Sequence, residues 1–153
     1  MIRNIIFDLG NVMVQNPSFD TVKAFFRNEE DAINFNNYIF KSDFWKLMDL
    51  GKISNLEVSN QIKEKQLVRL SNYMEVEYFM LNWFTKCNVN NETMELGINL
   101  KQQGYNVYIL SNMAKATFEY FSNKYQFFKI IDGAVVSGYE HVKKPDRRIF
   151  EVL

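Results

Sequence analysis

The stretch Ile5-Ile6-Phe7-Asp8-Leu9-Gly10-Asn11-Val12 decides the fold of this chain. An apolar run here ends in a carboxylate, and Gly10 then allows a sharp turn and a close approach of the backbone to a ligand. Such a run is typical of a strand that is covered on both faces, and in open parallel sheets ligands bind outside the carboxyl ends of the strands. The pattern therefore predicts a buried strand that presents Asp8 at its functional end. An aspartate here can also be only the cap or turn residue of a loop between strand and helix, so this stretch alone leaves both interpretations open.

Two later stretches repeat the arrangement with other polar groups. Residues 105–110 predict a second strand that leads into Ser111-Asn112, and residues 134–136 predict a third that is followed by Lys143-Lys144-Pro145. Helices are predicted between them, from Asn90 or Asn91 to Gly104 and from Ala114 to about Asn123. Alternation of strands and helices predicts a parallel α/β sheet. A carboxylate, a hydroxyl and an ammonium group would then follow the ends of its strands.

These three groups together suit phosphoryl transfer. A carboxylate can attack phosphorus and form an aspartyl-phosphate, which divides one difficult hydrolysis into two easier steps. A serine hydroxyl can donate to a phosphoryl oxygen, and a lysine can stabilise the charge of nucleophile and phosphate. Mg²⁺ would complete the neutralisation, because it is commonly held by one or two carboxylates together with substrate phosphate and water.

The ordered motifs resemble the haloacid dehalogenase (HAD) superfamily, over the whole length of the chain. The resemblance rests on Phe7-Asp8-Leu9-Gly10-Asn11-Val12, on Leu110-Ser111-Asn112 and on Lys144-Pro145 with Arg148-Ile149-Phe150. The similar branch is that of the capped phosphatases, and the group that can be named is the bacterial α-D-glucose-1-phosphate phosphatase-like proteins. The resemblance implies an α/β fold, a Rossmann-like parallel sheet with an inserted, all-helical cap domain.

The resemblance also implies roles for particular residues. Asp8 would be the nucleophile and a metal ligand, and the carbonyl of Gly10 would be a second ligand of Mg²⁺. Ser111 and Asn112 would bind the phosphoryl group. Lys144 would be the motif lysine, rather than Lys143, because the family's lysine directly precedes the proline.

Two departures from the family's pattern matter. Most of its phosphatases carry an aspartate as general acid and base two residues after the nucleophile, where this chain has Gly10. Loss of a positioned acid or base typically removes about 10²- to 10⁴-fold in rate. The branch with Asp-Leu-Gly-Asn tolerates this departure, but it also leaves dehalogenase chemistry open. Attack by one aspartate on a carbon that bears a halide needs neither that acid nor a metal.

The second departure is the family's fourth motif, an acidic pair that should follow Lys144-Pro145. No Asp-Asp pair occurs in the chain, and a helix predicted to begin near Pro145 has no stop signal before Leu153. We therefore expect a sheet that is truncated at its C-terminal side, with residues 4–7 as an exposed apolar edge that invites self-association. The expected consequence is weak Mg²⁺ binding and slow turnover, unless a partner or further residues complete the site.

The segment between the first strand and the second has a helical pattern. Apolar residues recur at three- and four-residue steps, as at Val76, Phe79 and Met80, and Ser54-Asn55-Leu56-Glu57 is a capping box. We predict four or five short helices and a division into an α/β core of residues 1–15 and 89–153 with a helical cap of residues 16–88. Core packing is the ordinary explanation of the aromatic stripes. The functional alternative is that one edge of the cap closes over Asp8 and selects the substrate.

Composition excludes several classes of function. Eighteen basic residues balance eighteen acidic ones, so neither nucleic acid nor a membrane surface is predicted as a partner. Cys87 is the only cysteine and His141 the only histidine, which argues against a disulfide, a cysteine zinc cluster or a Ser-His-Asp triad. The first apolar run breaks at Asp8, too early for a signal peptide, and a cytoplasmic location is the default expectation.

The leading hypothesis is a HAD-like hydrolase, a Mg²⁺-dependent phosphatase of small phosphomonoesters of the sugar-phosphate type that works through an aspartyl-phosphate on Asp8. Its partner would be a small phosphorylated metabolite. One alternative is a metal-independent dehalogenase that uses the same aspartate. The other is a non-catalytic remnant or interaction module that pairs through its open sheet edge.

Overall fold

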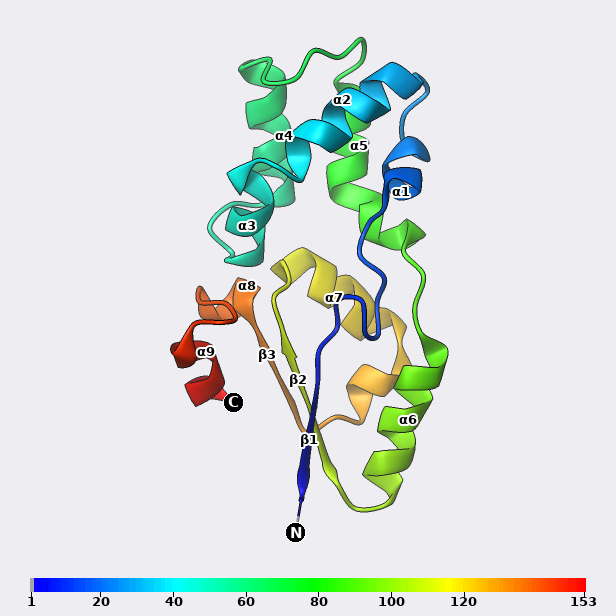
Figure 1. Ribbon diagram of the computed structural model, residues 1–153, viewed down its shortest axis with the longest axis vertical. Helices are drawn as coiled ribbons and strands as arrows, with labels where there is room; N and C mark the ends of the chain where they lie inside the picture. Colours follow the sequence, from blue (N-terminus) through cyan, green and yellow to red (C-terminus); the bar gives the residue numbers. More distant parts are fainter. Residues whose placement is uncertain (1) are drawn as a thin grey trace. The chain divides into compact units, whose positions relative to one another are not determined.

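The structure, a computed structural model, describes residues 2–153 and divides the chain into two compact units. The first, which we call the sheet unit, contains the residues up to Asn16 together with Asp49–Gly51 and Asn88–Leu153. The second, the helical unit, contains Pro17–Met48 and Lys52–Cys87. Figure 1 labels the elements of both.

The sheet unit is built on a parallel sheet of the three predicted strands. They are β1 (Asn4–Phe7), β2 (Asn106–Ser111) and β3 (Gly133–Val136), in the order β1-β2-β3. The register pairs Phe7 with Ile109 and Ser111 with Val136, so the carboxyl ends of all three strands meet at one edge. The predicted α/β class and parallel pairing are confirmed.

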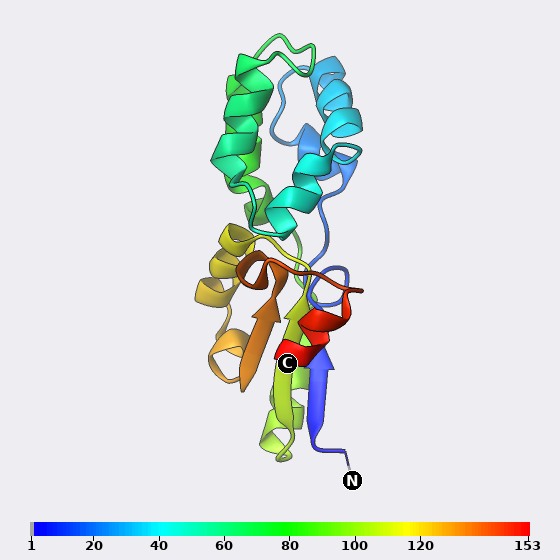
Figure 2. The same ribbon diagram turned by 90° about the vertical axis from the view of Figure 1, so that its left-hand side faces the viewer.

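The helices of the sheet unit lie on both faces of the sheet, with α9 in front of it and α6 behind it in Figure 2. The side chain of Asn90 caps α6 by accepting a hydrogen bond from the backbone N–H of Thr93 at 3.1 Å, which confirms one of the two predicted caps. The helices that follow β1 in this unit are α6 (Asn91–Gln102), α7 (Lys115–Lys124), the 3-10 helix η2 (Gln126–Lys129), α8 (Ser137–Glu140) and α9 (Arg147–Val152).

Apolar side chains pack on each face of the sheet. On one face Leu110 and Val135 pack with Ile149 of α9, and Val142 joins this cluster. On the opposite face the ring of Phe7 meets that of Phe127 edge to face, with centroids 6.3 Å apart. The two clusters hold β1, β2 and β3 between helices, as expected for a parallel sheet.

The expected exposed edge is confirmed: β1 is an edge strand among the described residues, and the Ile6 side chain is 50% exposed. The prediction from the apolar run alone, a strand covered on both faces, is wrong. The last helix, α9, begins near Pro145, as predicted. Asp146 is the N-cap of α9, since its carboxylate accepts the N–H of Arg148 at 3.0 Å, and Pro145 precedes this cap.

The helical unit contains five α-helices, as predicted, and one 3-10 helix among the described residues. Its core is aromatic: the rings of Phe35 and Phe79 lie 5.1 Å apart, and Phe25 and Phe26 extend the cluster at 5.5 and 5.2 Å. The predicted capping box at Ser54 is present. The elements are α1 (Phe19–Lys23), α2 (Glu29–Ile39), α3 (Asp43–Asp49), α4 (Asn55–Glu64), α5 (Met74–Asn82) and η1 (Trp83–Lys86).

Buried polar side chains of the helical unit are bonded to its backbone. The Asn55 side chain donates to the carbonyl of Met80 at 2.6 Å, and Asp31 accepts the N–H of Ser71 at 2.9 Å. Such bonds remove the cost of burying a polar group and so favour one packing of the helices. None of the helices in residues 2–153 is long and apolar enough to cross a membrane.

Candidate active site at the carboxyl edge of the sheet

A lysine joins the ends of β1 and β2. The ammonium of Lys144 lies 2.7 Å from Oδ2 of Asp8 and donates to the carbonyl of Leu110 at 3.0 Å. The Asp8 side chain is 42% exposed and that of Lys144 is 24% exposed. An ion pair with this exposure contributes little to stability, about 0–1 kcal/mol. Its significance is therefore that it brings a reachable carboxylate and an ammonium group together.

Asp8 also begins the turn after β1. Its Oδ1 accepts the N–H of Leu9 at 2.8 Å, and the carbonyl of Leu9 in turn accepts the N–H groups of Val12, Met13 and Val14. The turn and ligand interpretations of Asp8 are thus compatible. One carboxylate oxygen holds the loop, and the other faces the lysine.

The side chain of Asn112 positions Lys144. Its Oδ1 accepts the N–H of Lys144 at 2.8 Å, and its Nδ2 donates to the carbonyl of the same residue at 3.1 Å. This pair of bonds holds the backbone of the lysine against the end of β2, much as a neighbouring strand would. Sequence reasoning placed Asn112 at the site but did not identify this clamp.

Ser111 is the last residue of β2, and its hydroxyl is not satisfied by the protein. The residue is fully buried, and its Oγ has no hydrogen-bond partner among the described residues. A buried hydroxyl without a partner costs about 1–3 kcal/mol. An orphaned group next to the Leu110 carbonyl, which already binds Lys144, points to a ligand that supplies the missing acceptor.

Gly10 leaves no room for an acid at its position without movement of a neighbour. A Cβ atom placed there would lie 3.1 Å from Oδ1 of Asn16, whose backbone N–H binds the side chain of Asn11. Most phosphatases of the family carry an acid at the position of Gly10. Here the nearest polar side-chain group outside the adjacent residues is the amide of Asn16.

The donors that could hold a metal here are the carboxylate of Asp8 and the carbonyl of Gly10. Both are oxygen ligands, which suits Mg²⁺, and this ion is commonly held by one or two carboxylates together with phosphate and water. Within residues 2–153 no three His, Cys, Asp or Glu side chains form a cluster that could hold a metal. The residues present thus fit an ion that takes most of its ligands from substrate and water.

Two residues at this edge, Ser137 and Asp49, were not predicted from the sequence. The hydroxyl of Ser137 donates to the carbonyl of Asp49 and accepts the N–H of Met113 at 3.0 Å, and Nδ1 of His141 lies 2.9 Å from the carbonyl of Leu50. Asp49 thus belongs to the sheet unit, although sequence analysis assigned it to the helical domain. One signal was available: Gly51 is the only glycine between Gly10 and Gly97.

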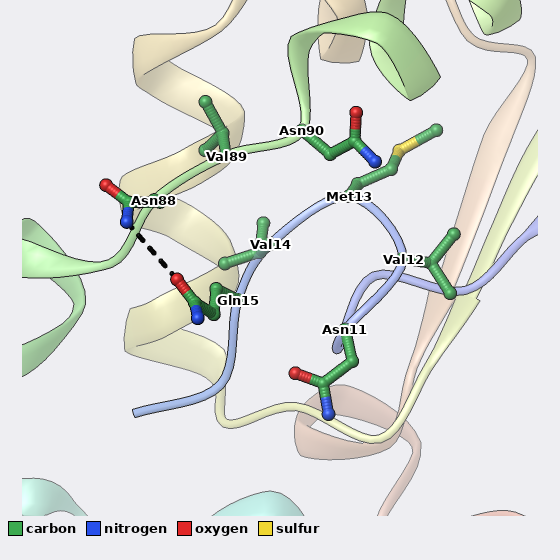
Figure 3. Close-up of a pocket in the computed structure, with 8 residues that line it drawn as sticks. All are labelled: Asn11, Val12, Met13, Val14, Gln15, Asn88, Val89 and Asn90. Carbon is green, nitrogen blue, oxygen red and sulfur yellow. Dashed lines mark hydrogen bonds between the residues drawn. The ribbon is translucent and has the colours of Figure 1, made fainter. Parts of the chain in front are cut away.

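A separate hollow of about 350 Å³ lies beside the segments that leave and re-enter the sheet unit (Figure 3). There the side chain of Asn88 donates to Gln15 at 3.2 Å, and backbone bonds join Gln15 to Asn88 and Asn90 to Met13. Its lining has amides and apolar groups but no titratable side chain. It includes none of Asp8, Ser111 and Lys144, so it is not the candidate active site.

With this geometry established, comparison with solved structures defines the class of fold. The chain has the fold of HAD-family enzymes. The wild-type form of one such enzyme from Bacteroides thetaiotaomicron, in complex with magnesium and inorganic phosphate, matches with a TM-score of 0.69 and 20% identity, over 99% of this chain and 77% of that one.

Two further structures match over 99% of this chain. A protein from Porphyromonas gingivalis, described as a predicted HAD-like family hydrolase, matches over 74% of its length with a TM-score of 0.69 and 21% identity. The L-2-haloacid dehalogenase of Xanthobacter autotrophicus matches over 63% of its length with a TM-score of 0.60 and 13% identity. No family model and no curated protein matches the sequence. At these identities the likeness concerns the fold alone.

Proposed function

We propose that this chain is a phosphatase of small phosphomonoesters, of the sugar-phosphate type, that forms an aspartyl-phosphate on Asp8. The observation that carries the proposal is the orphaned hydroxyl of Ser111 at the strand edge where Lys144 joins Asp8 to the Leu110 carbonyl. A phosphoryl group is an anion with several acceptor oxygens, so it can satisfy a hydroxyl and an ammonium group at once. The magnesium and phosphate in the enzyme from Bacteroides thetaiotaomicron support this choice.

The residues divide the work of binding and attack. Lys144 holds the carboxylate of Asp8 beside the phosphoryl group and stabilises negative charge there, while Ser111 donates to a phosphoryl oxygen. Asp8 attacks phosphorus, the P–O bond to the alcohol breaks, and water later cleaves the aspartyl-phosphate. Asn112 keeps Lys144 in place through its two backbone bonds.

Mg²⁺ would be held by the carboxylate of Asp8 and the carbonyl of Gly10. When bound, it would neutralise charge on the transferred phosphoryl oxygens. The helical unit would act as the cap that selects the substrate, and the reaction would take place in the cytoplasm.

The test is release of inorganic phosphate from a panel of sugar phosphates and other small monoesters, with and without Mg²⁺. We expect Mg²⁺-dependent turnover that Asp8→Asn abolishes, and mass spectrometry of the quenched enzyme should find one phosphoryl group on Asp8. Asp20→Asn is the matched control, because Asp20 is an exposed aspartate of the helical unit. Equal activity of the Asp8→Asn variant and the parent chain would refute the proposal.

A dehalogenase is the second candidate, and the absence of an acid at Gly10 favours it. Here Asp8 would attack the carbon that carries a halide and form an ester, which water hydrolyses without a metal. Halide release from 2-haloacids in the presence of EDTA, without phosphatase activity, would select this candidate.

The third candidate is a non-catalytic interaction module. In the described chain β1 has a strand on one side only, and Ile6 is half exposed on it. Concentration-dependent self-association that a charged substitution of Ile6 abolishes, with no turnover of either class of substrate, would favour this function.

A further inference from the structure

Residues Asp49–Gly51 belong to the sheet unit, although Asp49 is the last residue of helix α3, whose other residues belong to the helical unit. Gly51 has a φ of +62°, and a Cβ placed on it would lie 2.2 Å from the carbonyl oxygen of Gly138. A side chain at this position would collide with backbone, so the close approach requires glycine. The contact places Asp49 against the segment that follows β3.

Two polar side chains fix this contact. The hydroxyl of Ser137 bridges the carbonyl of Asp49 and the N–H of Met113, which lies just after β2. His141 bonds the carbonyl of Leu50 from the loop that continues to the motif lysine. Asp49 is thus tied to the loops after both β2 and β3, at the edge where Asp8 and Lys144 meet.

The carboxyl group of Asp49 is partly buried and takes part in none of the hydrogen bonds or ion pairs found for the described residues. Burial raises its pKa from the ordinary 3.8 to about 7, and the positive charge of Lys143 opposes this rise. Lys143 directly precedes Lys144, whose ammonium binds Asp8. The group can therefore both donate and accept a proton near neutral pH.

Among the described residues, the other titratable groups on the segments around Asp49 are cationic, exposed or paired with one another, and Lys46 and Lys52 of its own segment are exposed cations. His141 is engaged by the carbonyl of Leu50, and Glu140 is exposed. The remaining titratable side chains of the neighbouring segments pair among themselves: Lys115, Glu119 and Tyr139.

We propose that Asp49 is the general acid and base of the phosphatase reaction, in place of the acid that Gly10 lacks. This inference rests on the proposed function. In the first step the Asp8 oxygen bonds to phosphorus, the bond from phosphorus to the alcohol oxygen breaks, and the Asp49 proton passes to that oxygen. In the second step the Asp49 carboxylate takes a proton from water while the water oxygen attacks phosphorus and frees Asp8.

The first experiment compares leaving groups in Asp49→Asn. Release of an alkyl alcohol from its phosphate ester should fall by about 10²- to 10⁴-fold, because a poor leaving group needs the proton. Release of one equivalent of 4-nitrophenolate from 4-nitrophenyl phosphate in a single turnover should stay close to the parent rate, since this leaving group needs none. Asp43→Asn, which changes an exposed aspartate of the same helix, should leave both rates unchanged.

The second experiment does not depend on turnover. Carbon-13 NMR of the aspartate carboxyls, assigned with Asp49→Asn, should give a titration of Asp49 near pH 7. Tungstate, a dianion that resembles phosphate, should raise this midpoint further when it binds beside Asp8 and Lys144. The signal of Asp43 should not respond.

The outcomes separate the two proposals. If the parent chain neither turns over a phosphate ester nor binds tungstate, the proposed function fails and the role of Asp49 with it. If the parent is active but Asp49→Asn slows both esters equally or neither, or if tungstate leaves the titration unchanged, only the role of Asp49 is refuted.

Discussion

The two units differ in their buried polar groups: in the described chain, buried side chains without a hydrogen-bond partner occur in the sheet unit alone, although Ser137 of that unit is bonded. In the helical unit Asn55 and Asp31 are buried and bonded to the backbone of a neighbouring segment. In the sheet unit the hydroxyls of Ser111 and Thr117 are buried with no partner among the described residues. A hydrogen bond compensates for the desolvation of a buried polar group, whereas a buried group without a partner costs stability. Such a group calls for another explanation, such as a role in function. The difference predicts which substitutions harm stability and which harm activity.

Ser111→Ala should lower activity strongly with little loss of stability, the largest effect among the variants that test this comparison. Removal of one donor to a transition-state oxygen typically costs about 10²- to 10³-fold in kcat. The same substitution removes an unsatisfied buried hydroxyl, so the free energy of unfolding should stay the same or rise. Phosphate release together with urea denaturation followed by circular dichroism measures both. Loss of stability with unchanged turnover would assign Ser111 to the fold instead of the site.

Asn55→Ala should show the reverse. The Asn55 side chain donates to the Met80 carbonyl from within the buried core, and its loss should destabilise the helical unit by about 1–3 kcal/mol. Trp45 and Trp83, the only tryptophans, both belong to this unit, so their fluorescence reports its unfolding. Asn60→Ala, an exposed change in the same helix, is the matched control. Similar midpoints for the two variants would show that the bond contributes nothing.

The pH dependence of stability sharpens the comparison at Asp49. Burial raises the pKa of the folded state from 3.8 to about 7, so between these values the folded chain keeps a proton that the unfolded chain has lost. The stability that this group contributes is therefore present in full below about pH 4 and is lost as the pH rises through about 7. Asp49→Asn should remove this decline. Denaturation at several pH values, with Asp43→Asn as control, measures it, and parallel curves for the parent and the Asp49 variant would contradict the prediction.

Local patterns were sufficient to predict the sheet and much of the candidate site. The apolar run before Asp8, the strand before Ser111 and the proline after Lys144 are each visible within a few residues, and the structure brings these residues to one edge. The role of each in catalysis stays a prediction. Parallel pairing follows from alternation of strands and helices, so the common edge could be inferred without knowledge of any contact.

The remaining features depend on contacts between segments far apart in the chain. The helical pattern around Asp49 is the same whether this residue faces solvent or the sheet, and only the approach of Gly51 to Gly138 decides between them. The clamp of Asn112 likewise depends on where the loop before Pro145 returns. Periodicity records which face of an element is apolar, but it does not identify the partner of a single polar side chain.

Thr117→Val is the smallest expected effect and the strictest test of the comparison. Thr117, like Ser111, has a buried hydroxyl without a partner among the described residues, but it lies in helix α7 and not at the carboxyl end of a strand. Valine has nearly the same shape and lacks the hydroxyl, so the variant should be about as stable as the parent or more stable by about 1 kcal/mol, with unchanged turnover. Urea denaturation and phosphate release measure the two quantities. If Thr117→Val lowers turnover as much as Ser111→Ala does, an orphaned hydroxyl does not by itself mark the binding residue, and the assignment of Ser111 loses its main support.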